Sequence, residues 1–250
     1  GTKANYIGLE YGDPLPLISP DDELYILDFS VPEFMDHPML VWIDHHKSAM
    51  EKFGAKPGLQ IDGVAACRLA WQYFFGHPEN SKHAYVDRQI EEPWAVRLAG
   101  EYDIWDKRDP DAELFQHGLR SEDIKWDIIF TNNGYVEDLL TNGKALQYAK
   151  KNENASVLKN NGFTIHWEGL HLLACNHGQY NSFLFESGIT PDHDALLGFA
   201  WRGNKWSISL YGVLGKPDID LAAIAVKHGG GGHKQACGFT CVELPFKLIA

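Results

Sequence analysis

The 250-residue sequence is poor in cysteine and lacks a long apolar run. Its four cysteines form no Cys-x-x-Cys pair, and a chain of this length does not need a disulfide framework, so we expect reduced thiols and a cytoplasmic compartment. No run approaches the roughly 20 apolar residues of a membrane span. Residues 1–5 carry no apolar signal region. Neither a membrane protein nor a secreted one is therefore expected.

Positive charge is also scarce, because 22 Lys and Arg residues face 34 Asp and Glu residues, for a formal net charge of −12. Proteins that capture long duplexes usually present a basic face, so no long duplex partner is expected. The excess of carboxylate, together with 12 His, is compatible with a metal site that holds a small phosphorylated substrate. The hydrophobic share of 44% is that of an ordinary globular protein, and the length allows one large domain or two modest ones.

Two short apolar runs, 24–27 and 40–43, predict buried strands, because continuous apolar runs of this length suit a parallel sheet covered on both faces. Helical patterns follow over 64–75, from residue 94 onward, and over 136–158. A further helix is predicted after Ser121, which resembles an N-cap, through Trp126 to Phe130.

A polar stretch around residue 160 predicts a domain boundary, and the pattern changes after it. Strands are predicted over 163–167, 170–174, 196–201 and 206–211, with a turn at 202–205 and a short helix over 221–226. The predicted fold class is α/β. A parallel-sheet domain (1–150) is joined by a helical connector (151–161) to a smaller α+β domain (162–250).

Polar side chains follow both predicted strands of the first domain. Asp28 ends one run, and Asp44, His45 and His46 end the other. Ligand sites in open parallel sheets form at the carboxyl ends of the strands, and this donor set suits a divalent ion such as Mn²⁺. One His would bind the metal while the other faces substrate or is oriented by a partner. The alternative is that each Asp is only a cap or a turn residue.

Two further segments carry candidate residues. Asp103 lies in the acidic cluster 101–106 and is either a further ligand or a solvated surface carboxylate. Gly229 to Gly232 and His233 follow a predicted helix. Such a glycine run lets backbone N–H groups approach a phosphate closely, with His233 as a further donor. The alternative for the glycine run is a flexible linker.

Asp44-His45-His46 at the end of an apolar strand, with Leu27-Asp28-Phe29-Ser30 upstream, resembles the DHH phosphoesterase superfamily. The sequence GGGGHKQACGF at 229–239 resembles the signature of that superfamily's DHHA1 C-terminal domain. The two motifs occur in the expected order, about 185 residues apart. The resemblance implies two divalent ions, Mn²⁺ or alternatively Mg²⁺, in a cleft between two domains, where phosphoester or phosphoanhydride bonds are hydrolysed.

The resemblance also implies roles for individual residues. Asp28 would bridge the two ions, and His45 and Asp103 would be ligands, with Asp106 as an alternative to Asp103. Asp44 would hold the imidazoles, and His46 would face the substrate phosphate. The predicted substrate-binding loop contains Gly230, Gly231, Gly232 and His233.

The sequence departs from the family pattern at two places. The family's first motif, a strand followed by His-x-x-x-Asp-Gly or a near variant, is not seen, so either the chain is an N-terminally shortened form or part of the site has been lost. Tyr211 stands where many relatives have an arginine, and a tyrosine cannot clamp a phosphate as a guanidinium does. Arg202, Lys205 or Lys216 would then have to compensate.

The resemblance predicts a metal-dependent phosphodiesterase that acts on short oligonucleotides or dinucleotides. One alternative is a phosphohydrolase of polyphosphate or pyrophosphate. Another is a degenerate module that binds a nucleotide without cutting it. The sequence leaves open the oligomeric state, a homo-oligomer included.

Overall fold

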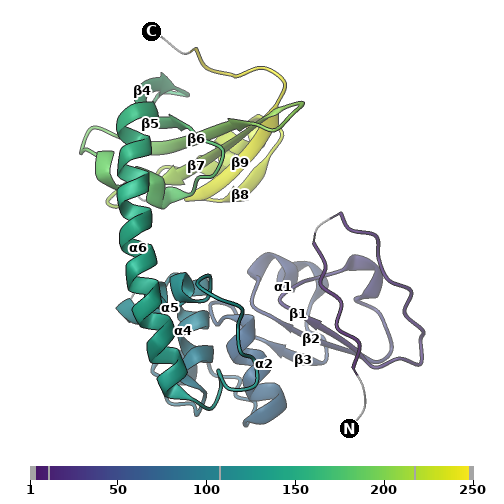
Figure 1. Ribbon diagram of the computed structural model, residues 1–250. Helices are drawn as coiled ribbons and strands as arrows, with labels where there is room; N and C mark the ends of the chain where they lie inside the picture. Colours follow the sequence, from purple (N-terminus) through teal and green to yellow (C-terminus); the bar gives the residue numbers. More distant parts are fainter. Residues whose placement is uncertain (1–3, 11, 107, 217, 248–250) are drawn as a thin grey trace. The chain divides into compact units, whose positions relative to one another are not determined.

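The computed structural model describes residues 4–10, 12–106, 108–216 and 218–247 (Figure 1). The chain divides into two compact units, Gly1–Lys144 and Ala145–Ala250. The long helix α6 (Asn133–Asn161) contains the division. The other elements of the first unit are β1 (Leu24–Leu27), η1 (Pro32–Phe34), β2 (Leu40–Asp44), α1 (Lys47–Phe53), β3 (Gly58–Gln60), α2 (Ala66–Phe75), α3 (Lys82–Val86), α4 (Trp94–Asp103) and α5 (Pro110–Gly118).

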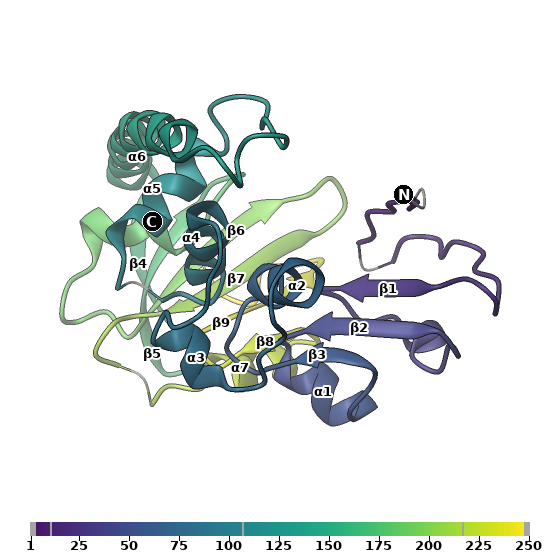
Figure 2. The same ribbon diagram turned by 90° about the horizontal axis from the view of Figure 1, so that it is seen from below.

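The sheet of the first unit is parallel, in the order β1-β2-β3, which confirms the predicted parallel sheet. Successive side chains of β2 enter separate clusters, as the period of a strand requires. Trp42 packs with Ile26 on one face, and Ile43 packs with Leu59 and Leu69 of α2 on the other. Figure 2 shows α2 beside the strands. Both faces are covered at β2, which is almost continuously apolar, whereas Tyr25 and Leu27 of β1 are exposed.

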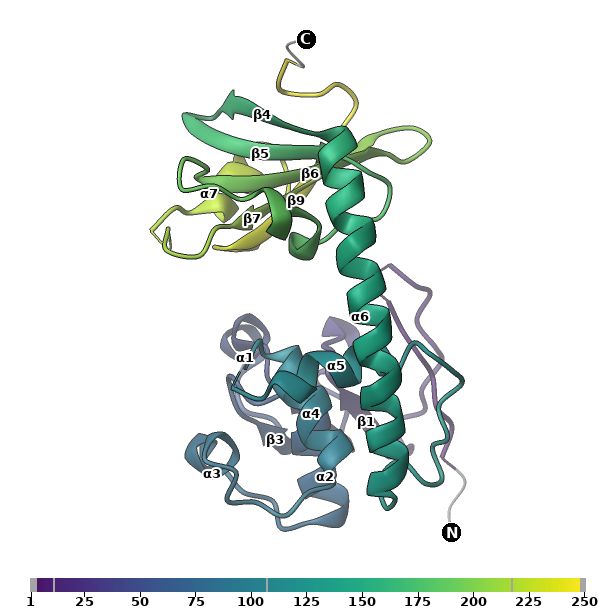
Figure 3. The same cartoon turned by 60° about the vertical axis from the view of Figure 1, so that its left-hand side comes forward.

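Helices α4 and α5 pack beside the first half of α6 (Figure 3). Leu98 of α4, Phe115 of α5 and Leu139 of α6 meet in one buried cluster. The helix predicted after Ser121 is not formed, and 121–131 consists of bends and turns. A stretch of five residues, 126–130, of which Asp127 is charged, is too short to hold a helix by itself. Asn132 caps α6 directly downstream, where its side chain accepts from the Tyr135 N–H.

The second unit contains a six-stranded sheet in the order β4-β5-β6-β7-β9-β8, in which only β5 and β6 run parallel. All four strands predicted here are present, and Arg202 and Lys205 close the predicted turn. Helix α7 covers one face of the sheet, and the end of α6 covers the other. The elements are β4 (Gly162–Trp167), β5 (Leu170–Asn176), η2 (Ser182–Gly188), β6 (Ala195–Trp201), β7 (Trp206–Gly212), α7 (Leu221–Lys227), β8 (Gly231–His233) and β9 (Ala236–Cys241).

The boundary predicted near residue 160 differs from the division at Lys144 and Ala145. The predicted connector, 151–161, is the end of α6, where Leu158 is buried against Leu173 and Phe185. A few apolar side chains on one face are enough to dock an otherwise polar helix, so polarity alone does not mark a connector. The ends of the predicted domains, 1–3 and 248–250, lie outside the described residues. Within the described chain, every helix is too short or too polar to cross a bilayer.

Candidate metal centre and glycine loop

The parallel register of β1 and β2 brings their carboxyl ends together. Leu27 pairs with Ile43, and the Asp28 N–H donates to the Ile43 carbonyl at 2.9 Å, so Asp28 and Asp44 follow neighbouring strands at the same edge. Asp28 has a φ of 57°, a left-handed conformation that is uncommon outside glycine and that Asp and Asn tolerate best. This turn directs the chain away from the sheet directly after β1.

His45 lies between two carboxylates. Its Nε2 is 3.2 Å from Asp28 Oδ1 and 3.4 Å from Asp103 Oδ2. Asp28, His45 and His46 each offer a ligand atom, and these atoms lie within 4.8 Å of one another. His45 therefore lies near both other predicted ligands, Asp28 and Asp103, whereas the set whose ligand atoms all lie within 4.8 Å of one another consists of Asp28, His45 and His46.

Asp44 is fully buried and holds the two histidines. Its Oδ1 accepts from the backbone N–H groups of His45 and His46, at 2.6 and 3.1 Å, and lies 2.7 Å from His46 Nδ1. Bonding at Nδ1 fixes the ring and leaves His46 Nε2 to face a ligand. The other oxygen of Asp44, Oδ2, has no hydrogen-bond partner among the described residues. A buried carboxylate oxygen is costly unless a water or an ion pairs with it.

Asp103 and Asp106 are separated by the end of α4. The Asp106 N–H donates to the Glu101 carbonyl at 2.8 Å, and Trp105 has a φ of 56°, which is the geometry of a Schellman motif. This motif reverses the chain after Asp103. Asp106 then turns to Arg108, whose Nε lies 2.8 Å from its Oδ1, while Asp103 faces His45.

The end of α4 is held by a buried ion network that the sequence did not indicate. Glu101 has no exposed surface and accepts from Arg88 Nε and Nη2 at 2.8 Å each and from Arg97 Nη1 at 3.2 Å. Asp109 accepts from Arg97 at 2.7 Å. A network this buried restrains α4 two residues before Asp103, and so positions that carboxylate.

The pKa values describe how the cluster behaves without a cation. The pKa of His45 is raised, chiefly by its hydrogen bond to Asp28, while burial opposes that shift. Burial raises the pKa of Asp103. The two carboxylates therefore favour a positive charge beside them, and a divalent cation would supply it. Carboxylate oxygen and imidazole nitrogen are donors that Mn²⁺ accepts, so the residues fit a divalent ion.

The glycine run ends a helix and begins a hairpin. The N–H groups of Gly229 and Gly230 donate to the carbonyls of Val226 and Ala225, at 3.0 and 2.8 Å, in a second Schellman motif. These two N–H groups are therefore not available to an anion, contrary to the predicted nest. A Cβ on Gly230 would lie 2.1 Å from the Gly238 carbonyl oxygen, so this position requires glycine.

The rest of the run forms β8, which pairs with β9, so it is not a flexible linker. Gly232 has a φ of 134° and also has no room for a Cβ. Gly231 differs, because a Cβ there would meet no atom within 4 Å and its φ is not positive. His233 is exposed at the end of β8. Packing therefore does not explain the glycine at position 231, and among the predicted loop residues Gly231 and His233 have open space beside them.

Three side chains that sequence reasoning missed anchor the start of the glycine run. His228 stacks on Phe239, with ring centroids 4.8 Å apart, and its Nε2 lies 3.0 Å from Glu168 Oε1. Lys227 Nζ lies 2.6 Å from Glu168 Oε2. Glu168 reaches them from the tight turn between β4 and β5, where Glu168 and Gly169 both have a positive φ. The Glu-Gly pair between two strands was a readable turn signal, but its partners were not.

No protein-family model matches the sequence, and no curated protein matches it. Among solved structures, a pGpG-specific phosphodiesterase from Vibrio cholerae is 12% identical, over 86% of this chain and 84% of its own, with a TM-score of 0.44. An exopolyphosphatase-related protein from Bacteroides fragilis is 17% identical over 90% and 66%, with a TM-score of 0.44. The DHH domain of a protein assigned to a family of ribosomal proteins is 14% identical over 80% and 59%, with a TM-score of 0.46. Structural similarities this weak do not show which substrate this chain uses.

Proposed function

We propose that this protein is a divalent-metal-dependent hydrolase of phosphoester bonds in short oligonucleotides or dinucleotides. The observation that carries the proposal is the position of His45 Nε2, at 3.2 Å from Asp28 and 3.4 Å from Asp103. Carboxylates from β1 and from α4, far apart in the sequence, converge on one imidazole. Structural packing does not require such a convergence of polar groups, and the motifs that resemble DHH and DHHA1 domains supply the reaction class.

In this proposal Asp28, His45 and Asp103 hold Mn²⁺, with Mg²⁺ as the alternative. When bound, divalent ions lower the pKa of coordinated water and neutralise charge on phosphoryl oxygens. Asp44 holds the His46 ring through Nδ1, so that Nε2 faces the substrate phosphate. Gly231 and His233 contact a phosphate or a chain end in the second unit, while Gly230 and Gly232 shape the backbone there.

The test is hydrolysis of a 5′-phosphorylated dinucleotide by the whole chain with Mn²⁺, compared with the Asp28→Asn and Asp106→Asn variants. Asn keeps the left-handed conformation at position 28 and removes the charge. We expect Asp28→Asn to lower kcat/KM at least about 100-fold, since partners beyond the metal ligands already cost 10- to 100-fold. Asp106→Asn, which loses only its Arg108 partner, should stay near the unsubstituted rate.

Two results would replace this proposal with one of the alternatives. Release of phosphate from tripolyphosphate, with no cleavage of the dinucleotide, would favour a polyphosphate phosphohydrolase. Nucleotide binding without hydrolysis of either substrate would favour the degenerate binding module. Full activity of Asp28→Asn on the dinucleotide would contradict the proposed metal site.

A further inference from the structure

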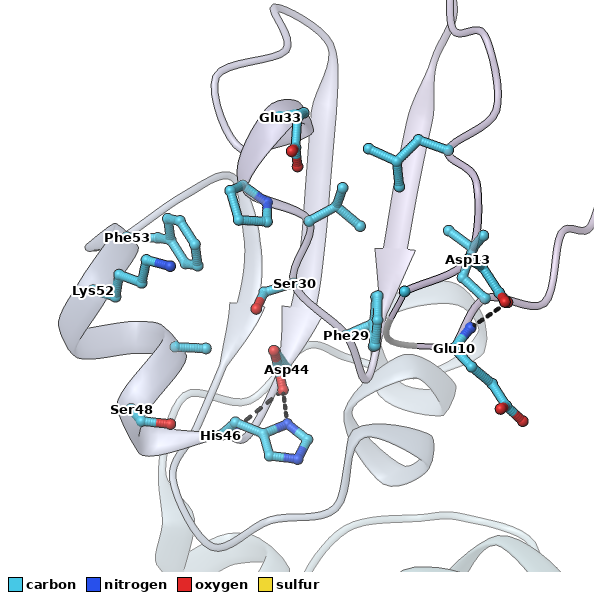
Figure 4. A pocket seen from close by; sticks show the side chains of 16 residues that line it. Glu10, Asp13, Phe29, Ser30, Glu33, Asp44, His46, Ser48, Lys52 and Phe53 are labelled. Atoms are coloured by element: carbon cyan, nitrogen blue, oxygen red, sulfur yellow. Dashed lines mark hydrogen bonds and ion pairs between the residues drawn. The ribbon is translucent and has the colours of Figure 1, made fainter. Parts of the chain in front are cut away.

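A pocket of about 530 Å³ lies beside the candidate metal centre, within the first unit (Figure 4). Its walls are residues 9, 10, 12, 13 and 15 of the N-terminal segment, residues 29–33 after β1, and residues of α1, together with Asp44 and His46. Sites for small organic ligands span roughly 300–1,000 Å³, so the pocket is larger than an ion or a single phosphate needs. Asp28, His45 and Asp103 are not among its lining residues.

His46 connects the pocket to the metal centre. It lines the pocket, and its Nδ1 is 3.9 Å from Asp28 Oδ1. A ligand with a phosphate at His46 would therefore place whatever is attached to that phosphate in or beside the pocket. The pocket is thus suitably placed to recognise the body of a substrate whose phosphate is held next to it.

One wall of the pocket is apolar and held in place before any ligand binds. Phe53 of α1 meets the fully buried Trp42 edge to face, with ring centroids 6.3 Å apart. Trp42 Nε1 also donates to the Phe29 carbonyl at 2.8 Å, which fixes the loop after β1. Val31 and Pro32 extend this wall. A preformed apolar wall that contains an aromatic ring suits a flat ring system, because little ordering is needed on binding.

The polar groups of the pocket are both donors and acceptors. Ser30, Glu33, Ser48 and Lys52 are among the lining side chains drawn in Figure 4. Within the described chain, the side chains of Ser30, Glu33 and Ser48 make no hydrogen bond, and Lys52 only lies over the Phe53 ring at 4.8 Å. An acyl chain would leave all these groups unpaired, which is unfavourable. A heterocycle whose edge carries both donors and acceptors could pair with them.

The charge of the pocket excludes a polyphosphate chain. Four acidic residues line it against a single lysine: Glu10, Asp13, Glu33 and Asp44, against Lys52. The negative charges that line the pocket repel an extended polyanion, whereas an uncharged ring meets no such repulsion. We infer that the pocket binds the base of a nucleotide substrate, with Phe53 as the stacking residue. This inference rests on the proposed function and adds to it a binding site for the base.

The inference can be tested by binding, without catalysis. We would titrate the whole chain, in a chelator, with GMP, CMP, ribose 5-phosphate and tripolyphosphate, and repeat the titrations with Phe53→Ala and Phe53→Leu. Phe53→Leu keeps apolar packing against Trp42 if alanine unfolds the wall. At least one nucleotide should bind at least about fivefold more tightly than ribose 5-phosphate, since stacking of a base on an aromatic side chain is worth about 1–3 kcal/mol. Both variants should reduce the ratio of nucleotide affinity to ribose 5-phosphate affinity toward one.

Phe75→Ala is the matched control, because Phe75 is an exposed aromatic residue of α2 outside the pocket. It should leave the ratio unchanged. Equal binding of nucleotide and ribose 5-phosphate, tighter binding of tripolyphosphate, or a ratio that survives both Phe53 variants would overturn the pocket assignment. Base-dependent binding without hydrolysis of a dinucleotide would instead contradict the proposed function alone.

Discussion

The two candidate regions are built differently. In the first unit, the carboxylates of Asp28, directly after β1, and of Asp103, at the end of α4, converge on His45, and a buried acid, Asp44, holds the His46 ring. In the second unit the backbone is the main feature, because Gly230 and Gly232 allow close approach between β8 and β9. A site made of side chains can be lost by one change of charge. A site made of backbone groups is lost only when a substitution prevents the backbone from adopting its conformation.

The largest effect should come from the network that supports the side-chain site. Glu101→Ala would remove a fully buried carboxylate that accepts hydrogen bonds from Arg88 and Arg97, so unfolding free energy should fall by about 3 kcal/mol. Urea unfolding followed by tryptophan fluorescence would measure it. Glu137→Ala, on the exposed side of α6, is the control and should change stability by less than about 0.5 kcal/mol. Equal effects of the two substitutions would show that α4 does not depend on this network.

Two neighbouring glycines should separate folding from binding in the second unit. Gly230→Ala would place a Cβ 2.1 Å from the Gly238 carbonyl oxygen and should cost about 1–3 kcal/mol of unfolding free energy. Gly231→Ala meets no atom within 4 Å, so stability should change by less than about 1 kcal/mol. KM for the dinucleotide should nevertheless rise in Gly231→Ala. A Gly231→Ala protein with unchanged stability and unchanged KM would remove the glycine loop from the proposed site.

The smallest effect is a pair of opposite pH dependences. The folded-state pKa of His45 is raised by Asp28, so its contribution to stability is fully present below the unfolded value near 6.5 and is lost as pH rises through the folded pKa. Burial lowers the pKa of His193, whose Nδ1 accepts from the Thr190 N–H at 3.0 Å. The second unit should therefore lose stability as pH falls below about 6.5.

NMR titration of the imidazole signals in the metal-free protein, assigned with His45→Gln and His193→Gln, would check this pair. His45 should titrate above a free histidine and His193 below it. The slope from either group is at most about 1.4 kcal/mol per pH unit. Equal pKa values for the His45 and His193 imidazoles would contradict the opposite shifts that their contacts indicate.

Much of the fold could be predicted because apolar runs report burial directly. Leu24–Leu27 is a strand with the predicted limits, and the four predicted strands of the second unit are all present. Several elements of the first unit were missed. Strand β3 was missed because Gly58–Gln60 is only three residues long, and α1 because Lys47–Phe53 lacks a sustained apolar period; helices α3 and α5 were not predicted either. The helix predicted after Ser121 failed because a good cap does not compensate for a short apolar segment.

The candidate site was predictable where it depends on strand ends and not where it depends on a helix end. Asp28 and Asp44 follow apolar strands, and parallel pairing alone brings them to one edge. The choice between Asp103 and Asp106 depended on a Schellman motif with a non-glycine residue, Trp105, at the left-handed position. Such a motif is rarely legible in a single sequence, because glycine is its usual signal.

The central claim is that Asp28, His45 and Asp103 together bind a divalent cation. Calorimetric titration of the whole chain with Mn²⁺, in the unsubstituted protein and in the Asp103→Asn and Asp106→Asn variants, tests it most directly. We predict that Asp103→Asn weakens Mn²⁺ binding at least about tenfold, while Asp106→Asn binds as the unsubstituted protein does. Equal binding by the unsubstituted protein and Asp103→Asn, or a loss confined to Asp106→Asn, would contradict the account.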